Sequence, residues 1–154
     1  MYFCLLTLAI IIIDRVTKLL VVDRMPLGSS IPLIDGVFNL TYILNPGAAF
    51  GMLEHNRTFF IVLTCGVLLG AFFLKKHILQ EPPLCKYGVA LFLGGAIGNL
   101  IDRIDTGLVI DFFDFIIWPV FNMADIAICV GVGMIIWSTM EEETKKKKIL
   151  AQNQ

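Results

Sequence analysis

Charge is what this sequence lacks most, since Asp, Glu, Lys and Arg together make up 16% of its 154 residues. In soluble domains, these four residue types make up about 25% of the chain. Hydrophobic residues make up 57% of the chain, many of them in long runs, and the mean hydropathy is +0.82. This composition excludes an ordinary soluble domain and predicts a membrane protein. The length suits one domain, so we expect residues 1–154 to form a single integral-membrane unit.

Several functional signatures are also missing. The sequence contains neither the G-x-S-x-G motif of many serine hydrolases nor the H-E-x-x-H motif of many zinc peptidases. No Cys lies at metal-ligand spacing from another Cys or a His, and we expect neither a disulfide nor a metal site. The net charge of −1, without a basic surface, sets nucleic acid aside as a partner. Carboxylate chemistry remains, and we expect no cofactor.

Apolar stretches along the chain predict membrane helices, each of which needs about 20 mostly apolar residues. The four candidates are Tyr2–Val22, Thr58–Leu74, Leu84–Ile104 and Phe121–Trp137. The first stretch lacks a basic n-region and a small-residue cleavage site, so we expect a retained helix rather than a cleaved signal peptide. The predicted fold is therefore a membrane all-α protein with four transmembrane helices.

The connections between these helices add one β element. Asp23–Arg57 is rich in Pro and Gly, and within it Val37–Leu44 has the β-branched and aromatic residues of a strand. The second long connection, Asp105–Val120, is expected to be a loop or a short re-entrant or interfacial segment. After the last helix, the tail Glu141–Gln154 carries EEE and then KKKK.

Lysines set the predicted topology, because cytoplasmic loops are enriched in Lys and Arg. The connection between the second and third helices has three lysines and the tail has four in a row, so both termini are expected in the cytoplasm. Specific binding of the lysine run to anionic lipid is an alternative. With this topology, the polar residues embedded in apolar sequence meet at the outer edge of the bilayer. They are Asp14, Lys18, Asn99, Asp102, Arg103, Asn122 and Asp125, joined by Asn45 and Asp111 from the outer connections.

Two acids carry the expected chemistry. VIDFFDF and FNMADIAI place Asp111 and Asp125 beside strongly apolar sequence, where carboxylates usually face a polar cavity. Asn122 and Asp125 are spaced i, i+3 and share one helix face. If Asp111 folds back against that face, the two carboxyl groups share one proton and can activate water, one as general base and one as general acid. A helix cap at Asp125 and an ordinary loop acid at Asp111 are the structural alternatives.

The first helix carries a possible ion pair. Asp14 and Lys18 are spaced i, i+4 in the favourable acid-first order, which suggests a neutralised pair that orients other groups. Arg15 is expected to point elsewhere and to snorkel toward the membrane surface.

The third helix ends in a polar cluster. Asn99, Asp102 and Arg103 follow on one predicted face, where an Asp102–Arg103 pair either satisfies itself or leaves the guanidinium free for substrate carbonyls. Glycines four residues apart let membrane helices approach closely, and we expect a packing role for them. The pairs with this spacing are Gly94 with Gly98 and Gly66 with Gly70.

NPGAAFG, Asn45–Gly51, combines Asn-Pro-Gly turn chemistry with small residues. A turn explains Pro46 and Gly47, while the small residues that follow suggest a surface shaped for a peptide. Trp118 suits the membrane interface and is expected to be an anchor.

Five segments, in this order, resemble the bacterial lipoprotein signal peptidase (signal peptidase II) family. They are DRVTK at Asp14–Lys18, NPGAAFG at Asn45–Gly51, GGAIGNLIDR at Gly94–Arg103, VIDFFDF at Val109–Phe115 and FNMADIAI at Phe121–Ile128. They cover essentially the whole chain apart from the tail, and no key position departs from the pattern.

The resemblance implies an inner- or plasma-membrane aspartic peptidase with four transmembrane helices and an outer β-cradle, built largely from Asp23–Arg57. Such an enzyme removes the signal peptide of prolipoproteins just before a Cys that carries diacylglycerol, uses no metal, and is blocked by globomycin-type depsipeptides. We further expect a monomer in membrane lipid. The resemblance implies a catalytic dyad of Asp111 and Asp125, substrate-binding or dyad-ordering roles for Asn45, Asn99, Arg103 and Asn122, and site-shaping roles for Asp14, Lys18 and Asp102.

Two other classes remain as rivals at this level. A small proton-coupled transporter would use Asp14, Asp102 and Asp125 as a relay, but it needs ionisable groups at several depths, and the inner halves of the predicted helices lack them. A non-enzymatic assembly or chaperone subunit would leave Asp111 and Asp125 replaceable.

Overall fold

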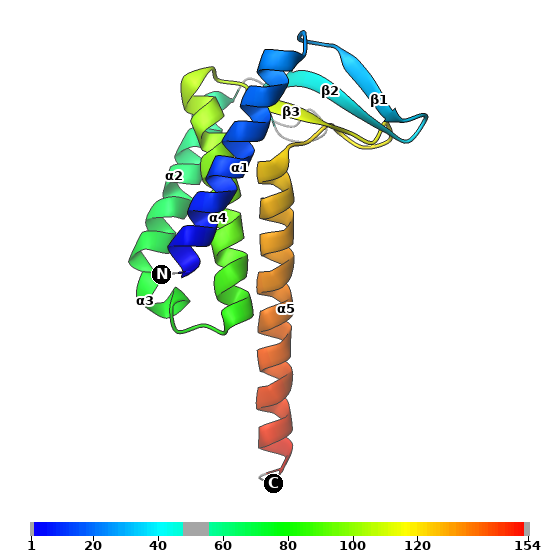
Figure 1. The fold of residues 1–154 in the computed structure, drawn as a ribbon. Coiled ribbons are helices and arrows are strands. Elements are labelled where there is room, and N and C mark those ends of the chain that lie inside the picture. Colours follow the sequence, from blue (N-terminus) through cyan, green and yellow to red (C-terminus); the bar gives the residue numbers. More distant parts are fainter. Residues whose placement is uncertain (1, 48–55, 153–154) are drawn as a thin grey trace.

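Four long helices stand together, and a small sheet extends sideways from one end of them, over the start of α5 (Figure 1). A computed structural model describes residues 2–47 and 56–152. The helices are α1 (Tyr2–Arg24), α2 (Arg57–Phe73), the short α3 (Lys75–Ile78), α4 (Pro83–Asp105) and α5 (Met123–Gln152), and the strands are β1 (Ser30–Ile34), β2 (Phe38–Asn45) and β3 (Val109–Asp114). Helix α4 is central, since it packs against α1, α2 and α5.

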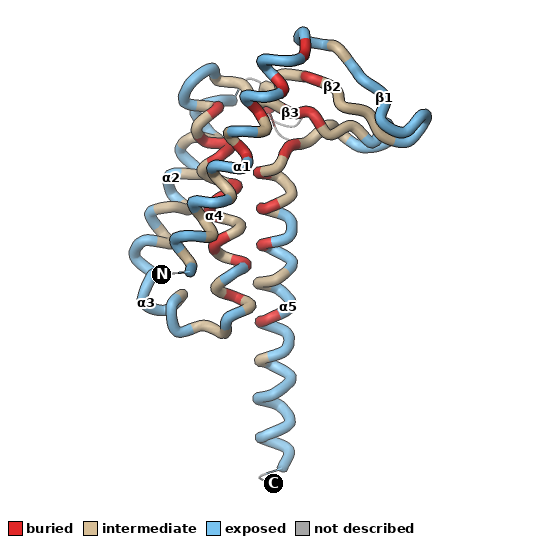
Figure 2. The backbone as a smooth tube through the Cα atoms, in the orientation of Figure 1, coloured by how far each residue is buried: buried red, intermediate tan, exposed pale blue. Residues whose placement is uncertain are grey.

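Each apolar stretch predicted to be helical is helical, but the last helix is longer than expected. It begins at Met123 and continues to Gln152, through the EEE and KKKK runs of the tail. These runs place opposite charges four residues apart, as in the Glu141–Lys145 ion pair of 2.6 Å, and such pairs stabilise an exposed helix. Nearly all residues of α5 beyond Ser138 are exposed (Figure 2).

The sheet is antiparallel with the order β1-β2-β3. Strand β2 confirms the strand predicted at Val37–Leu44, while β1 was not predicted. The expectation of a loop or a short re-entrant or interfacial segment over Asp105–Val120 did not include a strand, yet β3 lies within this segment and pairs with β2. The sheet therefore takes a whole strand from the second connection, not only from Asp23–Arg57.

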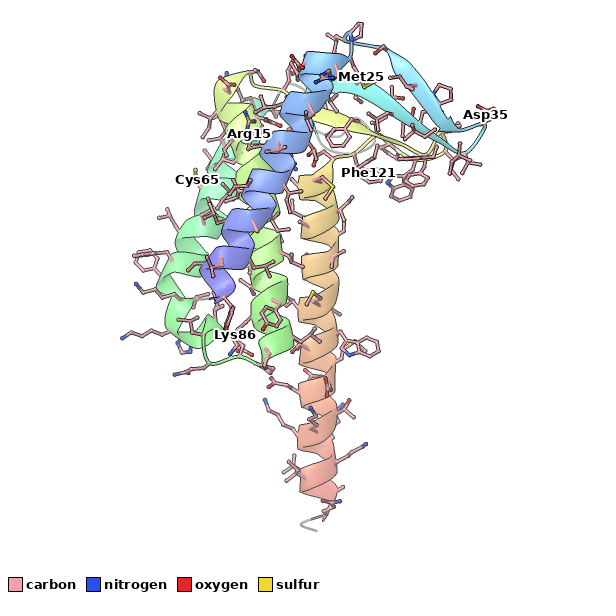
Figure 3. The ribbon with its side chains drawn as sticks, in the orientation of Figure 1. Arg15, Met25, Asp35, Cys65, Lys86 and Phe121 are labelled. Atoms are coloured by element: carbon pink, nitrogen blue, oxygen red, sulfur yellow. The ribbon has the colours of Figure 1, made fainter. Side chains whose placement is uncertain are left out.

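One face of the sheet is attached to the end of α1. Val21 and Met25 of α1 form a buried cluster with Tyr42 of β2 and Phe112 of β3. Figure 3 places Met25 at this junction, and Asp35 at the far tip of the β1–β2 hairpin. Burial of these large apolar side chains fixes the sheet across the helix ends, with β3 lying over the start of α5.

Burial is reversed relative to a water-soluble domain. The largest fully buried side chains are all polar: Lys18, Asn122, Asp14, Asp102 and Asp111. Large apolar side chains instead face outward along the helices, among them Leu5, Leu8, Ile12, Val62, Leu69 and Ile136. Hydrocarbon cannot solvate charged groups, so a protein in lipid encloses them. By length and composition, two of the described helices, α4 and α5, could cross a membrane, and α2 is a shorter apolar helix.

Glycines bring α4 close to its neighbours, as the sequence predicted for Gly94. A Cβ at Gly94 would lie 2.8 Å from Cβ of Ile10 on α1, and one at Gly95 would collide with the backbone of Ala124 on α5. The same expectation for Gly66 and Gly70 is wrong, since a Cβ at either position meets no described atom within 4 Å. Among the described residues, Gly66 and Gly70 therefore do not lie at a close contact between α2 and another helix.

Candidate active site

A buried ammonium ion lies at the centre of the polar cluster. Nζ of Lys18 is 2.9 Å from Oδ2 of Asp14 and 2.8 Å from Oδ2 of Asp102, and it donates to Oδ1 of Asn99 at 2.9 Å. The Lys18 side chain has no solvent exposure. An unpaired charge would be very costly there, and these three oxygens compensate it. The predicted Asp14–Lys18 pair is confirmed, with Asp102 as a second acid.

Arg15 corrects a prediction from the sequence. It does not snorkel, because its guanidinium pairs with Oδ1 of Asp102. Of the two alternatives for Asp102 and Arg103, a mutual pair is absent from the described contacts, since Asp102 pairs with Arg15 and Lys18 of α1. Two acids, Asp14 and Asp102, thus balance two cations, Lys18 and Arg15, so that the buried cluster is neutral.

Lys18 also determines how the Asn99 amide is oriented. An ammonium group only donates, so it must face the amide oxygen. The Asn99 amide nitrogen is then turned toward Asp125, to which it donates at 2.8 Å. Asn122 reinforces this orientation by donating its own amide to Oδ1 of Asn99 at 3.0 Å. A charge on α1 thereby sets a hydrogen bond to an acid on α5.

Asp125 is positioned by the start of α5. The side-chain oxygen of Asn122 accepts from the backbone N–H of Asp125 at 3.0 Å, and Oδ2 of Asp125 accepts from the backbone N–H of Asn122 at 3.1 Å. This reciprocal pattern is a capping box with Asn and Asp in the two capping positions. Asp14 accepts from the N–H of Ala124 at 3.0 Å, which satisfies another donor of the first turn. The helix-cap alternative for Asp125 therefore describes part of its environment.

Asp111 is positioned by β3, where it pairs in register with Ile43 of β2. Its Oδ1 accepts from the Asn122 amide at 2.6 Å and its Oδ2 from the Asn45 amide at 2.9 Å. Its side chain is buried, and burial raises the pKa of Asp111 from 3.8 to about 7, with a further contribution from the charge of Asp125. The hydrogen bonds from the two amides and the charge of Lys18 oppose this shift. Asp111 can therefore hold a proton near neutral pH.

Both acids face one cavity of about 610 Å³. Its polar end is lined by Asn45, Asn99, Arg103, Asp111 and Asp125. The rest of the wall is mostly apolar and comes from α2, α4, α5 and the segment after β3; it includes Leu63, Val67, Phe92, Ala96, Trp118, Phe121, Ile126 and Val130. Phe121 lies where the sheet meets α5 (Figure 3). The cavity therefore combines an acidic end with a long hydrocarbon wall.

Arg103 reaches the same cavity from α4. Its Nη2 donates to the carbonyl of Gly47 at 3.1 Å, and its Nη1 lies 3.5 Å from the carbonyl of Asn99. The ring of Phe60 lies beneath it, with 4.5 Å between the guanidinium carbon and the ring centroid. No described carboxylate lies within salt-bridge distance of Arg103.

The structure brings together the nine polar residues singled out in the sequence. Asn45, Asp111, Asn122, Asp125, Asn99, Lys18, Asp14 and Asp102 form one connected network, and Arg103 lines the cavity beside it. Sequence reasoning missed Arg15 and Phe60, which have no distinctive spacing. The proposed peptide surface at residues 48–51 lies outside the described residues.

Two carboxyl groups linked through one buried residue, Asn122, at the acidic end of a cavity among apolar helices, define an enzyme site of the aspartic type in a membrane protein. Such a pair holds one proton, so one carboxylate can accept a proton from water while the other donates to a leaving group. Among the described residues, no group of three or more His, Cys, Asp and Glu is placed to hold a metal ion.

Comparisons with known proteins agree with this class. The family model described as "Signal peptidase (SPase) II" matches residues 6–141. A lipoprotein signal peptidase of Pelotomaculum thermopropionicum is 42% identical over 148 residues, covering 96% of this chain and 97% of the relative. Another, from Brevibacillus brevis, is 42% identical over 149 residues, covering 96% of this chain and 100% of the relative.

Solved structures support the same assignment. One, described as a bacterial membrane enzyme, superposes with a TM-score of 0.86 at 32% identity, covering 94% of this chain and 91% of that one. A second with the same description has a TM-score of 0.79, also at 32% identity, and covers 90% of this chain and 92% of that one. The chain belongs to the signal peptidase II family, and it is therefore a membrane peptidase of the aspartic type.

Proposed function

We propose that the chain removes signal peptides from diacylglyceryl-modified prolipoproteins, cutting before the lipidated Cys, with Asp111 and Asp125 as the catalytic pair. The names of the relatives give the substrate class. The observation that carries the residue assignment is the bridge made by Asn122, which donates to Asp111 through its side chain and to Asp125 through its backbone. Both acids also line the same cavity.

The reaction needs no covalent intermediate. One carboxylate of the pair takes a proton from water as the water attacks the scissile carbonyl, and the protonated partner delivers its proton to the departing amine. The raised pKa of Asp111, about 7, leaves a proton on the pair near neutral pH. Because the two groups interact, they titrate as a unit, and the proton belongs to the pair.

The remaining polar residues bind substrate or hold the acids in place. Asn45 and Asn122 donate to Asp111, and Asn99 donates to Asp125, so these amides order the dyad. Arg103 has guanidinium donors left for a backbone carbonyl of the substrate. Asp14 and Asp102 hold Lys18 in place, and Lys18 in turn orients the amide of Asn99.

The membrane arrangement completes the proposal. We place α1, α2, α4 and α5 across the bilayer as one domain, with both termini in the cytoplasm and the sheet on the outer side. In support, the polar network and the sheet lie at one end of the helices, while Lys75, Lys76 and the lysines of the α5 tail lie toward the other (Figure 1). The basic segment of about 141–154 is then a cytoplasmic tail of a monomeric enzyme.

The cavity suits a lipidated substrate. Its apolar wall between α2, α4 and α5 offers hydrocarbon contact, while the acids stand at the end nearest the sheet. A scissile bond at the membrane surface would lie at the acidic end while apolar parts of the substrate remain among the helices. Globomycin-type depsipeptides are expected to compete for this cavity. The transporter alternative finds no support in the family assignment.

Cleavage of a diacylglyceryl-modified precursor peptide by the purified full-length protein in detergent tests the proposal. We expect a shortened product on a gel, loss of that product with globomycin, and no cleavage by Asp111→Asn or Asp125→Asn. Both variants should be recovered from the membrane at wild-type levels. Full activity in either variant would refute the assignment of the dyad.

A further inference from the structure

Arg103 is the one described cation that lines the acidic cavity, and it is not paired with an acid. The charges of Asp125 and Asp111 act on it, yet neither carboxylate lies within salt-bridge distance among the described contacts. Guanidinium and carboxylate groups form strong bidentate pairs when their geometry allows. Some feature of the fold must therefore hold this side chain away from the dyad.

Phe60 is in contact with this guanidinium. It lies in the first turn of α2, three and four residues before Leu63 and Thr64, which line the cavity. Its ring lies under the guanidinium at 4.5 Å, an arrangement with cation–π attraction. The carbonyl of Gly47 accepts from the same guanidinium at 3.1 Å, so a ring and a carbonyl together fix its place. The guanidinium is thus held by a ring and a carbonyl, with no direct carboxylate contact among the described residues.

We propose that Phe60 is a positioning residue for the peptidase reaction: its ring keeps the guanidinium of Arg103 beside the acids but unpaired, where it is available to a substrate carbonyl. This inference rests on the proposed function. It gives α2, which contributes no residue to the polar network, a part in substrate binding.

Removing the ring has two expected effects. Without Phe60, the guanidinium can turn to the dyad, so it is withdrawn from substrate and its charge stabilises the ionised pair. The Michaelis constant should therefore rise, and the alkaline limb of the pH–activity profile should move to lower pH. The charged groups around the dyad are Asp14, Arg15 and Lys18 on α1, and Asp102 and Arg103 on α4; the acids of the dyad itself lie on β3 and α5. The cavity residues of α2, Leu63, Thr64 and Val67, carry no charge.

The experiment compares Phe60→Leu with wild-type enzyme, using a diacylglyceryl-modified precursor peptide across a range of pH. We expect KM to rise by about 2- to 30-fold, the range that a cation–π contact supports. Phe60→Trp, which keeps an aromatic face, should restore both KM and the alkaline limb. The matched control is Phe59→Leu, since Phe59 is an exposed neighbour on the same turn and should leave both readouts unchanged.

A double-variant cycle tests whether Phe60 acts through Arg103. If it does, Phe60→Leu combined with Arg103→Gln should have the same KM as Arg103→Gln alone. Additive losses, or a lower kcat with an unmoved alkaline limb in Phe60→Leu, would overturn the inference and leave Phe60 as packing.

A second test measures thermal unfolding without substrate for the four proteins of this cycle: wild type, Phe60→Leu, Arg103→Gln and the double variant. A coupling between Phe60 and Arg103 in unfolding supports the contact, and its absence contradicts it. Failure of wild-type enzyme to cleave the precursor would instead count against the proposed function, so the two failures are distinguishable.

Discussion

The ammonium group of Lys18 donates to the side-chain oxygen of Asn99 across the α1–α4 contact, at 2.9 Å. This bond decides which end of the Asn99 amide faces Asp125. A fully buried cation therefore acts on the dyad without touching it. Lys18 thus has two roles, balancing the charges of Asp14 and Asp102 and orienting the Asn99 amide, and variants can test each role separately.

Lys18→Met should destabilise the protein and abolish cleavage. The substitution leaves Asp14 and Asp102 buried with only Arg15 as a cation, and loss of one partner of a buried ion pair typically costs about 3–5 kcal/mol. Thermal unfolding in detergent measures the loss.

Adding Asp14→Asn to Lys18→Met should recover part of the thermal stability, since one negative charge is removed as well. Cleavage should remain absent, because the Asn99 amide still lacks the hydrogen bond from Lys18 and is oriented by Asn122 alone. Equal stability of the single and double variants would contradict the charge-balance explanation.

Asn122 allows helix capping and dyad ordering to be separated. Asn122→Ser keeps a good N-cap residue for α5 but loses the amide donor to Asp111, whereas Asn122→Ala loses both. We expect Asn122→Ser to unfold near the wild-type temperature with a much lower kcat. Asn122→Ala should lose about 1 kcal/mol of stability in addition. Wild-type kcat in Asn122→Ser would show that the bridge is dispensable.

The pH profile of kcat/KM should fall on the alkaline side near pH 7. The pKa of Asp111 is raised from 3.8 to about 7, so the shared proton is lost as the pH rises through that value and the general acid disappears. The same shift means that the folded state binds more protons than the unfolded chain between these values. The contribution of Asp111 to folding stability is therefore fully present below pH 3.8 and is lost as the pH rises through about 7. A profile flat to pH 9 would contradict this account.

Arg15→Gln should lower stability moderately and leave cleavage largely intact. Arg15 balances one charge of Asp102, but its side chain is 26% exposed, so solvent screens part of the interaction. We expect a loss of about 1 kcal/mol in thermal unfolding, and recovery with Arg15→Lys. An unchanged unfolding temperature would instead support the snorkelling expected from the sequence.

Local patterns made the helices predictable, and non-local contacts explain what was missed. Apolar runs located α1, α2, α4 and α5, since a helix satisfies its own backbone hydrogen bonds. Strand β3 is six residues with two acids, and it is recognisable as a strand only through its pairing with β2, more than sixty residues away. The direction of Arg15 likewise depended on the position of Asp102, which no periodicity could supply.

The candidate site was foreseen because its residues stand in distinctive motifs, although the contacts were not. The orientation of Asn99 follows from Lys18, and the neutrality of the cluster follows from Arg15; both need three-dimensional neighbours. Phe60 gave no signal because an aromatic residue in an apolar helix is unremarkable in composition. The wrong expectation for Gly66 and Gly70 has the same origin, since spacing alone does not tell which face meets a neighbour.

The pairing of β3 with β2 bears on when the enzyme becomes competent. Asp111 reaches the Asn45 amide only after β2, which is made early, pairs with β3, which is made late, and Asp125 follows on the last helix. A nascent chain still short of α5 thus holds at most half of the dyad. With the proposed dyad, proteolytic capacity therefore arises only when α5, the last helix of the bundle, has packed against α4.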